Sequence, residues 1–310
     1  MEKTVMPAAS IFEPKKLQNK RWRQWVTGYL MILPNFVGFL VFMLIPIIAT
    51  VVLGFTKWDL VNSPQWVGFA NYTNLFGDRI FWLSFRKTIW FALLNVPLQS
   101  FLALLVAVLL NRKLKALNLF RTLFIIPWIC MPVAVGLTWT WLLNTQFGYI
   151  NHILMNLGLE KIGWLTSRNI ALYAVIFVNI WQYLGWHIIL LLAGLQIVPQ
   201  ELYEAATVDG ANNWTRFWKI TIPMISPIFF YDLVVNMIMT LQIFDLPFAM
   251  TNGGPGNATR VFNLYLYQKG FSFLQMGEAC SMGVILFMLI IVATFLVFKF
   301  LGKRVNYDMY

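Results

Sequence analysis

Charged residues are scarce in this chain: they make up 11% of its 310 residues, whereas 59% are hydrophobic. A soluble domain carries about a quarter charged residues and less than half apolar ones. A soluble core cannot bury so much apolar surface, but a lipid bilayer accepts it around the whole circumference of a helix. The composition, with a mean hydropathy of +0.68, therefore excludes an ordinary soluble globular protein.

Cysteine and histidine are also scarce, with two residues of each. Cys130 and Cys280 both lie inside apolar runs, so we expect neither a disulfide framework nor a metal site. The two histidines are far apart, and the chain has no His-x-x-His or paired aspartate motif of the kind that a membrane enzyme would need. We therefore expect that the chain is not an enzyme.

Acidic residues are half as frequent as basic ones, 12 against 23, which gives a formal net charge of +11. In a soluble protein this excess would suggest nucleic acid as a partner. Here the basic residues lie between the apolar runs, a placement that favours a topology signal, so we expect no nucleic acid. The absence of a Gly-x-x-x-x-Gly-Lys-Ser/Thr phosphate loop excludes ATP hydrolysis by this chain itself.

What the chain does have is long hydrophobic runs, and a bilayer needs about 20 mostly apolar residues per helix. Prolines inside these runs suggest kinks, because neighbouring helices of a bundle re-satisfy the freed carbonyls. We predict an all-α, polytopic membrane protein. Its six transmembrane helices are expected at about residues 28–55, 88–110, 122–143, 169–195, 221–250 and 279–298.

The orientation follows from Lys and Arg alone, which concentrate on the cytoplasmic side. The two terminal segments and the two loops on the same side of the membrane hold fifteen of these residues, and the three longer loops opposite hold eight. Both termini are therefore predicted to be cytoplasmic. The first apolar run is too long for a cleavable signal peptide and is expected to remain as an anchor.

The predicted organisation has four parts. A cytoplasmic N-terminal segment is followed by the first span with its outer loop, then by a five-helix core that contains a cytoplasmic loop, and finally by a cytoplasmic tail. The parts cover residues 1–27, 28–84, 85–300 (with the loop at 196–223) and 301–310.

The cytoplasmic loop at residues 196–223, here called the coupling segment, has an unusual sequence for a connector. Pro199 is expected to open a short helix, and Ala205 and Ala206 give that helix a smooth face that a groove can approach closely. Gly210 is expected to end it, because glycine tolerates the left-handed conformation of a helix cap. A second helical turn carries Trp214, Phe217 and Trp218.

This segment resembles the EAA signature of permeases from binding-protein-dependent ABC importers. That signature is Glu-Ala-Ala, three residues, Gly, nine residues, Ile, one residue, Leu, Pro. Every spacing agrees, and the one departure is Ile222 in place of Leu. Further similarity in the Ile-Leu-Pro run at 32–34, in Asn71-Tyr72 with Leu75-Phe76, and in the loop at 252–255 points to the sugar-permease branch of type I importers. The residues that we assign to ATPase coupling are Glu204, Ala205, Ala206, Asp209, Gly210, Ile220 and Pro223.

The resemblance implies partners and a mechanism. The short helix would insert into a groove of a cytoplasmic ATPase, and ATP and Mg²⁺ would be bound by that partner and by no residue of this chain. The complex would contain a second homologous permease, two ATPase subunits and an extracellular solute-binding protein, in the cell membrane of a prokaryote and in contact with its lipid. The substrate would be a carbohydrate moved by alternating access.

Polar residues at membrane depth usually face a partner or a cavity, because burying them in lipid costs free energy. Amides, carboxylates and aromatic rings together suit a carbohydrate pathway, although hydrogen bonding between helices explains each polar residue equally well. His187 and Asp232 are expected to be structural, Asp232 with gating as an alternative role. The candidates for the substrate pathway are Asn179, Gln182, Trp186, Asn236, Gln242 and Asp245.

Other functions stay open at this point. The permease is also compatible with another solute delivered by a binding protein, such as a polyol phosphate. An ion-coupled secondary transporter is less favoured, because the chain shows no internal repeat. The outer loop at residues 251–256 is too rich in glycine and proline to be helical, and the resemblance places it near the docked binding protein.

Overall fold

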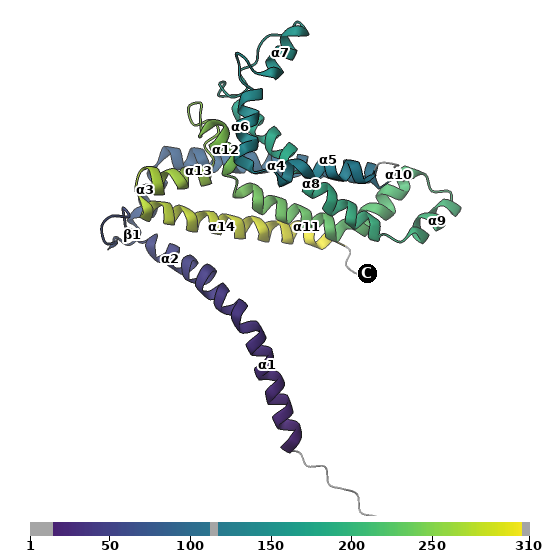
Figure 1. Cartoon of the computed structure of the whole chain (residues 1–310), viewed down its shortest axis with the longest axis horizontal. Helices are drawn as coiled ribbons and strands as arrows, with labels where there is room; N and C mark the ends of the chain where they lie inside the picture. Colours follow the sequence, from purple (N-terminus) through teal and green to yellow (C-terminus); the bar gives the residue numbers. More distant parts are fainter. Residues whose placement is uncertain (1–14, 112–116, 306–310) are drawn as a thin grey trace, which may run out of the picture. The chain divides into compact units, whose positions relative to one another are not determined.

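The computed structural model describes residues 15–111 and 117–305, and these residues are mostly helical, which confirms the predicted all-α class. The chain divides into two units, residues 1–52 and 53–310, and each is described by itself (Figure 1). Five helices of the described residues are long and apolar enough to cross a membrane. A sixth crossing is reached when one bent pair of helices counts as a single span.

The first unit is one long apolar helical run. It consists of α1 (Lys15–Phe39), a π-helical turn (Leu40–Leu44) and the start of α2 (Ile45–Leu53). Its apolar side chains are uncovered within the unit: Met31 is 77% exposed and Phe42 is 80% exposed. Lipid or a partner helix is the natural cover for such a surface.

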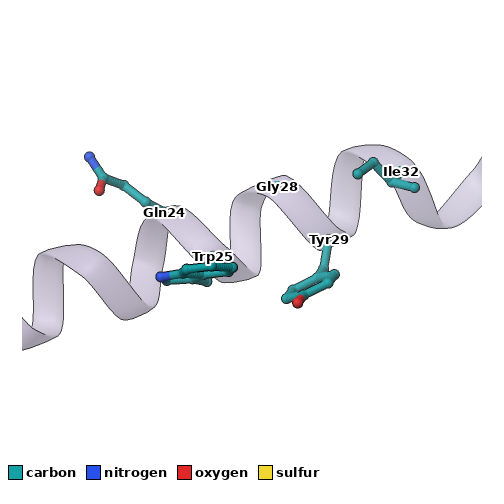
Figure 2. A pocket seen from close by; sticks show the side chains of 5 residues that line it. All are labelled: Gln24, Trp25, Gly28, Tyr29 and Ile32. Carbon is teal, nitrogen blue, oxygen red and sulfur yellow. The ribbon is translucent and has the colours of Figure 1, made fainter.

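Near the middle of α1, two aromatic rings lie along one face of the helix. Trp25 and Tyr29 stack with their centroids 6.3 Å apart (Figure 2). They border a hollow of about 590 Å³ whose lining residues all belong to α1. A hollow bounded by one helix is an open helix face rather than a binding site, and an aromatic pair at the start of an apolar run suits the interface between membrane and water.

The second unit begins with two short strands and a short helix. Strands β1 (Thr56–Lys57) and β2 (Gln65–Trp66) pair antiparallel, and α3 (Ala70–Gly77) follows. The amide of Asn71 fixes this region, because it donates to the backbone oxygens of Gly54 at 2.9 Å and Thr56 at 2.8 Å.

Four long helices form the body of the second unit. They are α4 (Arg79–Leu110), α8 (Ala171–Ile197), α11 (Ile222–Leu241) and α14 (Met276–Leu301). Helix α4 starts earlier than the predicted residue 88, because Asp78 caps it by accepting a hydrogen bond from the backbone N–H of Ile80 at 2.8 Å. Pro97 in α4 and Pro227 in α11 lie within continuous helices.

The third predicted span is not one helix. It is α5 (Leu117–Ile129) followed by α6 (Pro132–Leu142), with an angle of 96° between them. Met131 is extended and Pro132 starts the new helix, since proline lacks the N–H that would continue the old one. The carbonyl of Cys130 at the break accepts a hydrogen bond from Gln182 on α8 at 3.3 Å.

The fifth predicted span also ends early. Helix α11 stops at Leu241, and a separate short helix, α12 (Asp245–Thr251), follows. The backbone oxygen of Gln242 accepts a hydrogen bond from the Asn263 amide at 2.7 Å, which satisfies a carbonyl that a continuing helix would have used. The prediction of one helix over residues 221–250 was therefore wrong beyond Leu241.

Three apolar clusters hold the second unit together. Helix α4 contributes to all of them: one includes α6, α8 and α12, a second includes α8 and α11, and the third includes α3, α14 and α13 (Phe262–Tyr267). Helices α5 and α8 approach closely at Gly185, where an added Cβ would overlap the backbone oxygen of Phe124. Two more short helices, α7 (Tyr149–Asn156) and α9 (Gln200–Val208), project beyond the long ones (Figure 1).

Candidate functional site

The coupling segment folds as the local sequence predicted. Helix α9 follows Pro199 and ends just before Gly210, whose φ of +76° is the left-handed value that favours glycine. The backbone N–H of Ala211 closes the helix end by donating to the oxygen of Ala206 at 2.8 Å. A second helical piece, α10 (Asn213–Arg216), continues as a π-helical turn (Phe217–Thr221) directly into α11.

No described residue packs against the outer face of the coupling segment. Helix α9 contains no buried residue, and Val208 is 88% exposed. Trp214, at 70% exposed, extends the same uncovered apolar character into α10. Glu204 and Ala205 are exposed too, as residues that contact a partner protein must be.

The inner side of the segment is attached to α11. The hydroxyl of Tyr203 on α9 lies 2.9 Å from the hydroxyl of Thr221 at the end of the π-helical turn. The Arg216 guanidinium donates to the Thr207 hydroxyl at 2.9 Å, which ties α10 to α9. Ile220 packs against the apolar cluster of α4, α8 and α11, and Pro223 lies in the first turn of α11.

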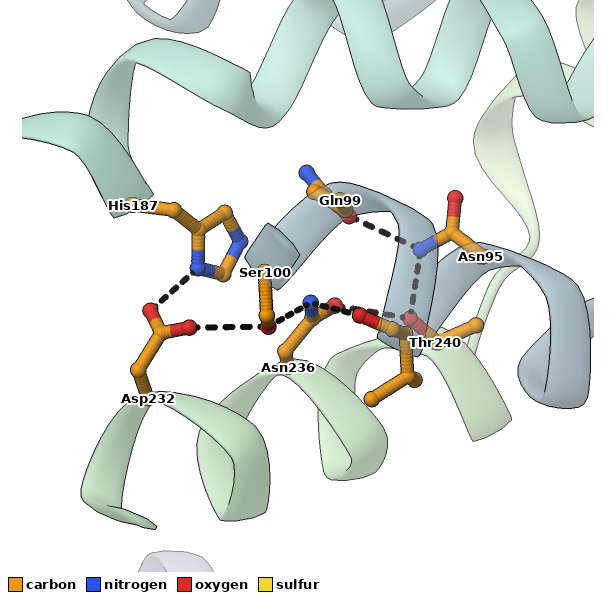
Figure 3. A network of polar contacts seen from close by, with 8 residues as sticks. Asn95, Gln99, Ser100, His187, Asp232, Asn236 and Thr240 are labelled. Atoms are coloured by element: carbon orange, nitrogen blue, oxygen red, sulfur yellow. Dashed lines mark hydrogen bonds and ion pairs between the residues drawn. The ribbon is translucent and has the colours of Figure 1, made fainter. Parts of the chain in front are cut away.

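A network of buried polar side chains lies farther along α11, where it meets α4 and α8 (Figure 3). Its one ion pair joins His187 Nδ1 to Asp232 Oδ1 at 2.6 Å, with both side chains at most 3% exposed. This contact joins α8 to α11, and the structural role expected for both residues stays a prediction. The network, called the polar network below, consists of Asn95, Gln99, Ser100, Asn179, His187, Asp232, Asn236 and Thr240.

The hydrogen bonds of one branch of this network all run in the same direction. Asn95 donates to Thr240 at 3.0 Å, and Thr240 donates to Asn236 at 3.1 Å. Asn236 donates to Ser100 at 3.1 Å, and Ser100 donates to Asp232 at 2.9 Å. The branch ends on a carboxylate, which is the strongest acceptor in the series.

A cavity of about 230 Å³ adjoins the polar network. Four of the six residues predicted for the substrate pathway line it. These are Asn179 of α8, Asn236 of α11, Gln242 of the turn that follows α11, and Asp245 at the start of α12. The other lining residues are Gln99, Tyr183, His187, Met239, Thr240, Ile243 and Phe244.

The remaining two predicted pathway residues lie elsewhere on α8. Gln182 is fully buried and donates to the carbonyl of Cys130 at the α5–α6 break. Trp186 stacks on Trp128 of α5, with ring centroids 5.0 Å apart. The structure therefore does not place Gln182 and Trp186 in the cavity with Asn179.

Three polar residues of α4 belong to this region although sequence reasoning did not select them. Asn95, Gln99 and Ser100 are all at most 1% exposed, and Gln99 lines the cavity. Their spacing in an otherwise apolar run was the available signal, since residues four apart lie on one face of a helix. Tyr183 and Phe244, which supply aromatic wall to the cavity, gave no such signal.

A second polar cluster lies where α4 and α14 begin, beside α13. Lys269 pairs with Glu278 at 2.7 Å and with Asp78 at 3.6 Å, and the Tyr265 hydroxyl donates to Asp78. Burial opposes ionisation of Asp78, but the bonds from Tyr265 and the Ile80 N–H and the charge of Lys269 outweigh it and lower the pKa of Asp78. Burial and the bond to Asp78 raise the pKa of Tyr265.

The glycine-rich outer loop follows α12, with Thr251 as the last helical residue. Asn252 and Gly253 both take positive φ, at 47° and 87°, which stops the helix there. The expectation that residues 251–256 are non-helical thus holds except at Thr251.

Comparison with known proteins identifies the fold. Residues 6–307 match the family described as "binding-protein-dependent transport system inner membrane component". The chain belongs to this family. It is therefore a permease component with several membrane-spanning helices, located in the membrane, and not an enzyme in its own right.

Individual relatives agree with the family match. The probable ABC transporter permease protein YesP of Bacillus subtilis (strain 168) is 37% identical over 288 residues, which cover 91% of this chain and 93% of that protein. The trehalose/maltose transport system permease protein MalF of Thermococcus litoralis is 33% identical over 281 residues, which cover 90% of this chain and 95% of MalF.

Among solved structures, a bacterial alginate ABC transporter in complex with an alginate pentasaccharide-bound periplasmic protein contains a similar chain. The two superpose with a TM-score of 0.80 at 25% sequence identity, over 91% of this chain and 96% of that one. The helical fold of this chain is therefore shared with a chain of that importer.

Proposed function

We propose that this chain is one of two permease subunits in an ATP-driven importer of carbohydrate. The substrate would arrive on an extracellular binding protein, and a separate pair of ATPases would hold ATP and Mg²⁺ and drive the cycle. Relatives whose names specify trehalose and maltose, and a similar chain in an alginate transporter, support a carbohydrate as the substrate class.

One observation carries the mechanism: a single helix connects the two candidate sites. The uncovered helix α9 is bonded to the start of α11 through Tyr203 and Thr221. The far end of α11 supplies Asn236 and Thr240 to the wall of the cavity. Movement of α9 by an ATPase would therefore be transmitted along α11 to the place where substrate passes.

The proposal is tested by charge reversal within α9. Glu204→Lys places a cation where the signature has its acid, and we expect import to fall by at least about tenfold, since reversing a buried interface charge costs several kcal/mol. Glu201→Lys makes the same reversal one turn away on the same exposed helix and is the matched control. The measurement is ATP-dependent uptake of neutral oligosaccharides into proteoliposomes that contain the full complex and its binding protein.

Three outcomes would contradict the proposal. Full import by Glu204→Lys would show that the segment does not couple to the ATPase. Equal losses in both variants would show that the signature position is not special. Import of no carbohydrate by the wild-type complex, with import of another solute, would overturn the substrate class.

A further inference from the structure

The cavity beside the polar network is small. Its volume of about 230 Å³ lies below the range of roughly 300–1,000 Å³ that is usual for ligand pockets. Its walls come from α4, α8, α11, the turn after α11 and Asp245 at the start of α12. A space of this size suits one six-membered ring at a time rather than a length of oligosaccharide.

Two buried amides at the cavity have hydrogen-bonding atoms without partners among the described residues. They are Gln99 Nε2, on a residue 1% exposed, and Asn179 Oδ1, on a residue 4% exposed. Figure 3 shows the amide nitrogen of Gln99 directed away from the polar network. One atom donates and the other accepts, and a sugar hydroxyl does both. Buried polar atoms are normally paired, so these two indicate a polar ligand.

His187 adds a third fixed group to the cavity wall. Its Nδ1 is held by Asp232 at 2.6 Å, while its Nε2 has no hydrogen bond among the described residues. A ring held at one nitrogen by a carboxylate has a fixed orientation, and a sugar hydroxyl, which both donates and accepts, can pair with the other nitrogen in either protonation state. Asp232 thus orients His187 for a ligand hydroxyl.

Aromatic rings complete the lining. Tyr183 and Phe244 both border the cavity. The C–H faces of a sugar ring are apolar and pack against aromatic rings, whereas its hydroxyl edges need hydrogen bonds. Rings combined with convergent donors and acceptors are the usual composition of a specific small-molecule pocket.

The charges around the cavity have one sign. Asp245 lines it and has neither a hydrogen bond nor an ion pair among the described residues, and no Lys or Arg is among the lining residues that the structure describes. The other nearby carboxylate, Asp232, is already paired with His187. An anionic ligand would meet Asp245 without a compensating cation, and like charges a few ångströms apart repel strongly where little water screens them.

We propose that this cavity binds one uncharged sugar ring and selects against anionic sugars such as uronates and sugar phosphates. The inference rests on the proposed function, because it specifies which carbohydrates the pathway accepts. Gln99, Asn179 and His187 bind the hydroxyl groups, Tyr183 and Phe244 pack against the ring, and Asp245 provides the discrimination.

The test uses two probes that differ only at one carbon: methyl α-D-glucopyranoside and methyl α-D-glucuronide. Binding of each to the complete importer in nanodiscs, without the binding protein, is measured by saturation-transfer NMR, which detects weak ligands. We expect the uncharged ring to bind at least about tenfold more tightly than the glucuronide.

Variants of Asp245 then test whether this residue causes the difference in affinity between the two probes. Asp245→Asn should reduce the difference in affinity between the two probes, and Asp245→Lys should reverse the preference. Asp59→Asn, which removes an exposed acid outside this cavity, is the matched control and should leave the preference unchanged. Thermal unfolding of each complex verifies that the variants fold.

Equal or tighter binding of the glucuronide to the wild-type complex would overturn the inference, and so would binding of neither probe. An unchanged preference in Asp245→Lys would show that Asp245 is not responsible. None of these results alters the outcome of the Glu204 and Glu201 comparison, so failure of this inference is distinguishable from failure of the proposed function.

Discussion

Asp232 carries the most hydrogen bonds to other helices of any acid described in the spans. It accepts from Ser100 on α4 and pairs with His187 on α8, and both contacts are buried. A carboxylate in such a place depends on its partners, because an uncompensated charge in a medium of low dielectric constant is strongly unfavourable. The pair therefore fixes how three helices meet.

We predict that Asp232→Ala lowers the free energy of unfolding of the assembled complex by about 3–5 kcal/mol, since it removes one member of a buried pair. Asp245→Ala is the control at a carboxylate that forms no ion pair among the described residues, and we expect little change there. The measurement is the unfolding midpoint of purified complexes, converted with the unfolding enthalpy.

The double variant His187→Leu/Asp232→Leu distinguishes this account from simple loss of packing. Replacing both partners by apolar groups should cost less than removing Asp232 alone. A double variant less stable than Asp232→Ala would show that the ion pair itself is net stabilising, contrary to the expectation.

At the scale of elements, α8 is the central helix of the second unit. One face meets α4 and supplies Asn179, Tyr183 and His187 to the cavity. The other carries Gln182 and Trp186 against α5. Its contact with α5 requires the absence of a side chain at Gly185, because the Phe124 carbonyl lies where a Cβ would be.

We predict that Gly185→Ala destabilises the complex by about 1–3 kcal/mol, the usual cost of overpacking, and displaces α5. Gly194→Ala on the same helix is the matched control. There the three atoms nearest to the added Cβ all belong to the side chain of Ile228, at 2.8–3.3 Å, and none is a backbone atom, so we expect a smaller loss of stability. Thermal unfolding compares the two, and equal stabilities would contradict the close contact of α5 and α8.

The elements differ in how far the sequence determined them. Apolar run length located the long helices, and the proline and glycine of the coupling segment located α9, because both signals are local. The prolines of the third run predicted a kink but not its position, since Pro127 lies inside α5 and Pro132 starts a new helix. Which of them interrupts the span depends on the helices packed around them.

The cavity shows the same limit. Polar residues within apolar runs marked Asn179, Asn236, Gln242 and Asp245 as candidates, and the structure lines one cavity with all four. The apolar sequence of α4 does not show which face of the helix packs against α11. Gln99 was therefore not selected as a candidate. Helical spacing grouped Gln182 with Asn179, but helices pack on both sides of α8, and the spacing does not identify the neighbour.

At the scale of the whole molecule, orientation rests on charge. The segments on the predicted cytoplasmic side hold fifteen Lys and Arg residues, and the loops on the opposite side hold eight. The coupling segment lies on that side, where ATPases would be available. Both termini are predicted to lie there too.

We predict that a membrane-impermeant maleimide labels Asn62→Cys in intact cells but labels Lys303→Cys only after the membrane is permeabilised. Both positions are exposed, and both variants are made with Cys130→Ala, because Cys130 is itself exposed. Labelling of Lys303→Cys in intact cells, or protection of Asn62→Cys, would reverse the orientation.

The bond between Tyr203 and Thr221 has a mechanical consequence. It joins positions 18 residues apart and so closes α9, Gly210 and α10 into a loop. A load applied to α9 reaches α11 both along the chain and directly through the two side chains, in parallel. The flexible turn at Gly210 is therefore not the only connection between α9 and α11. Most of a displacement of α9 should be transmitted to α11.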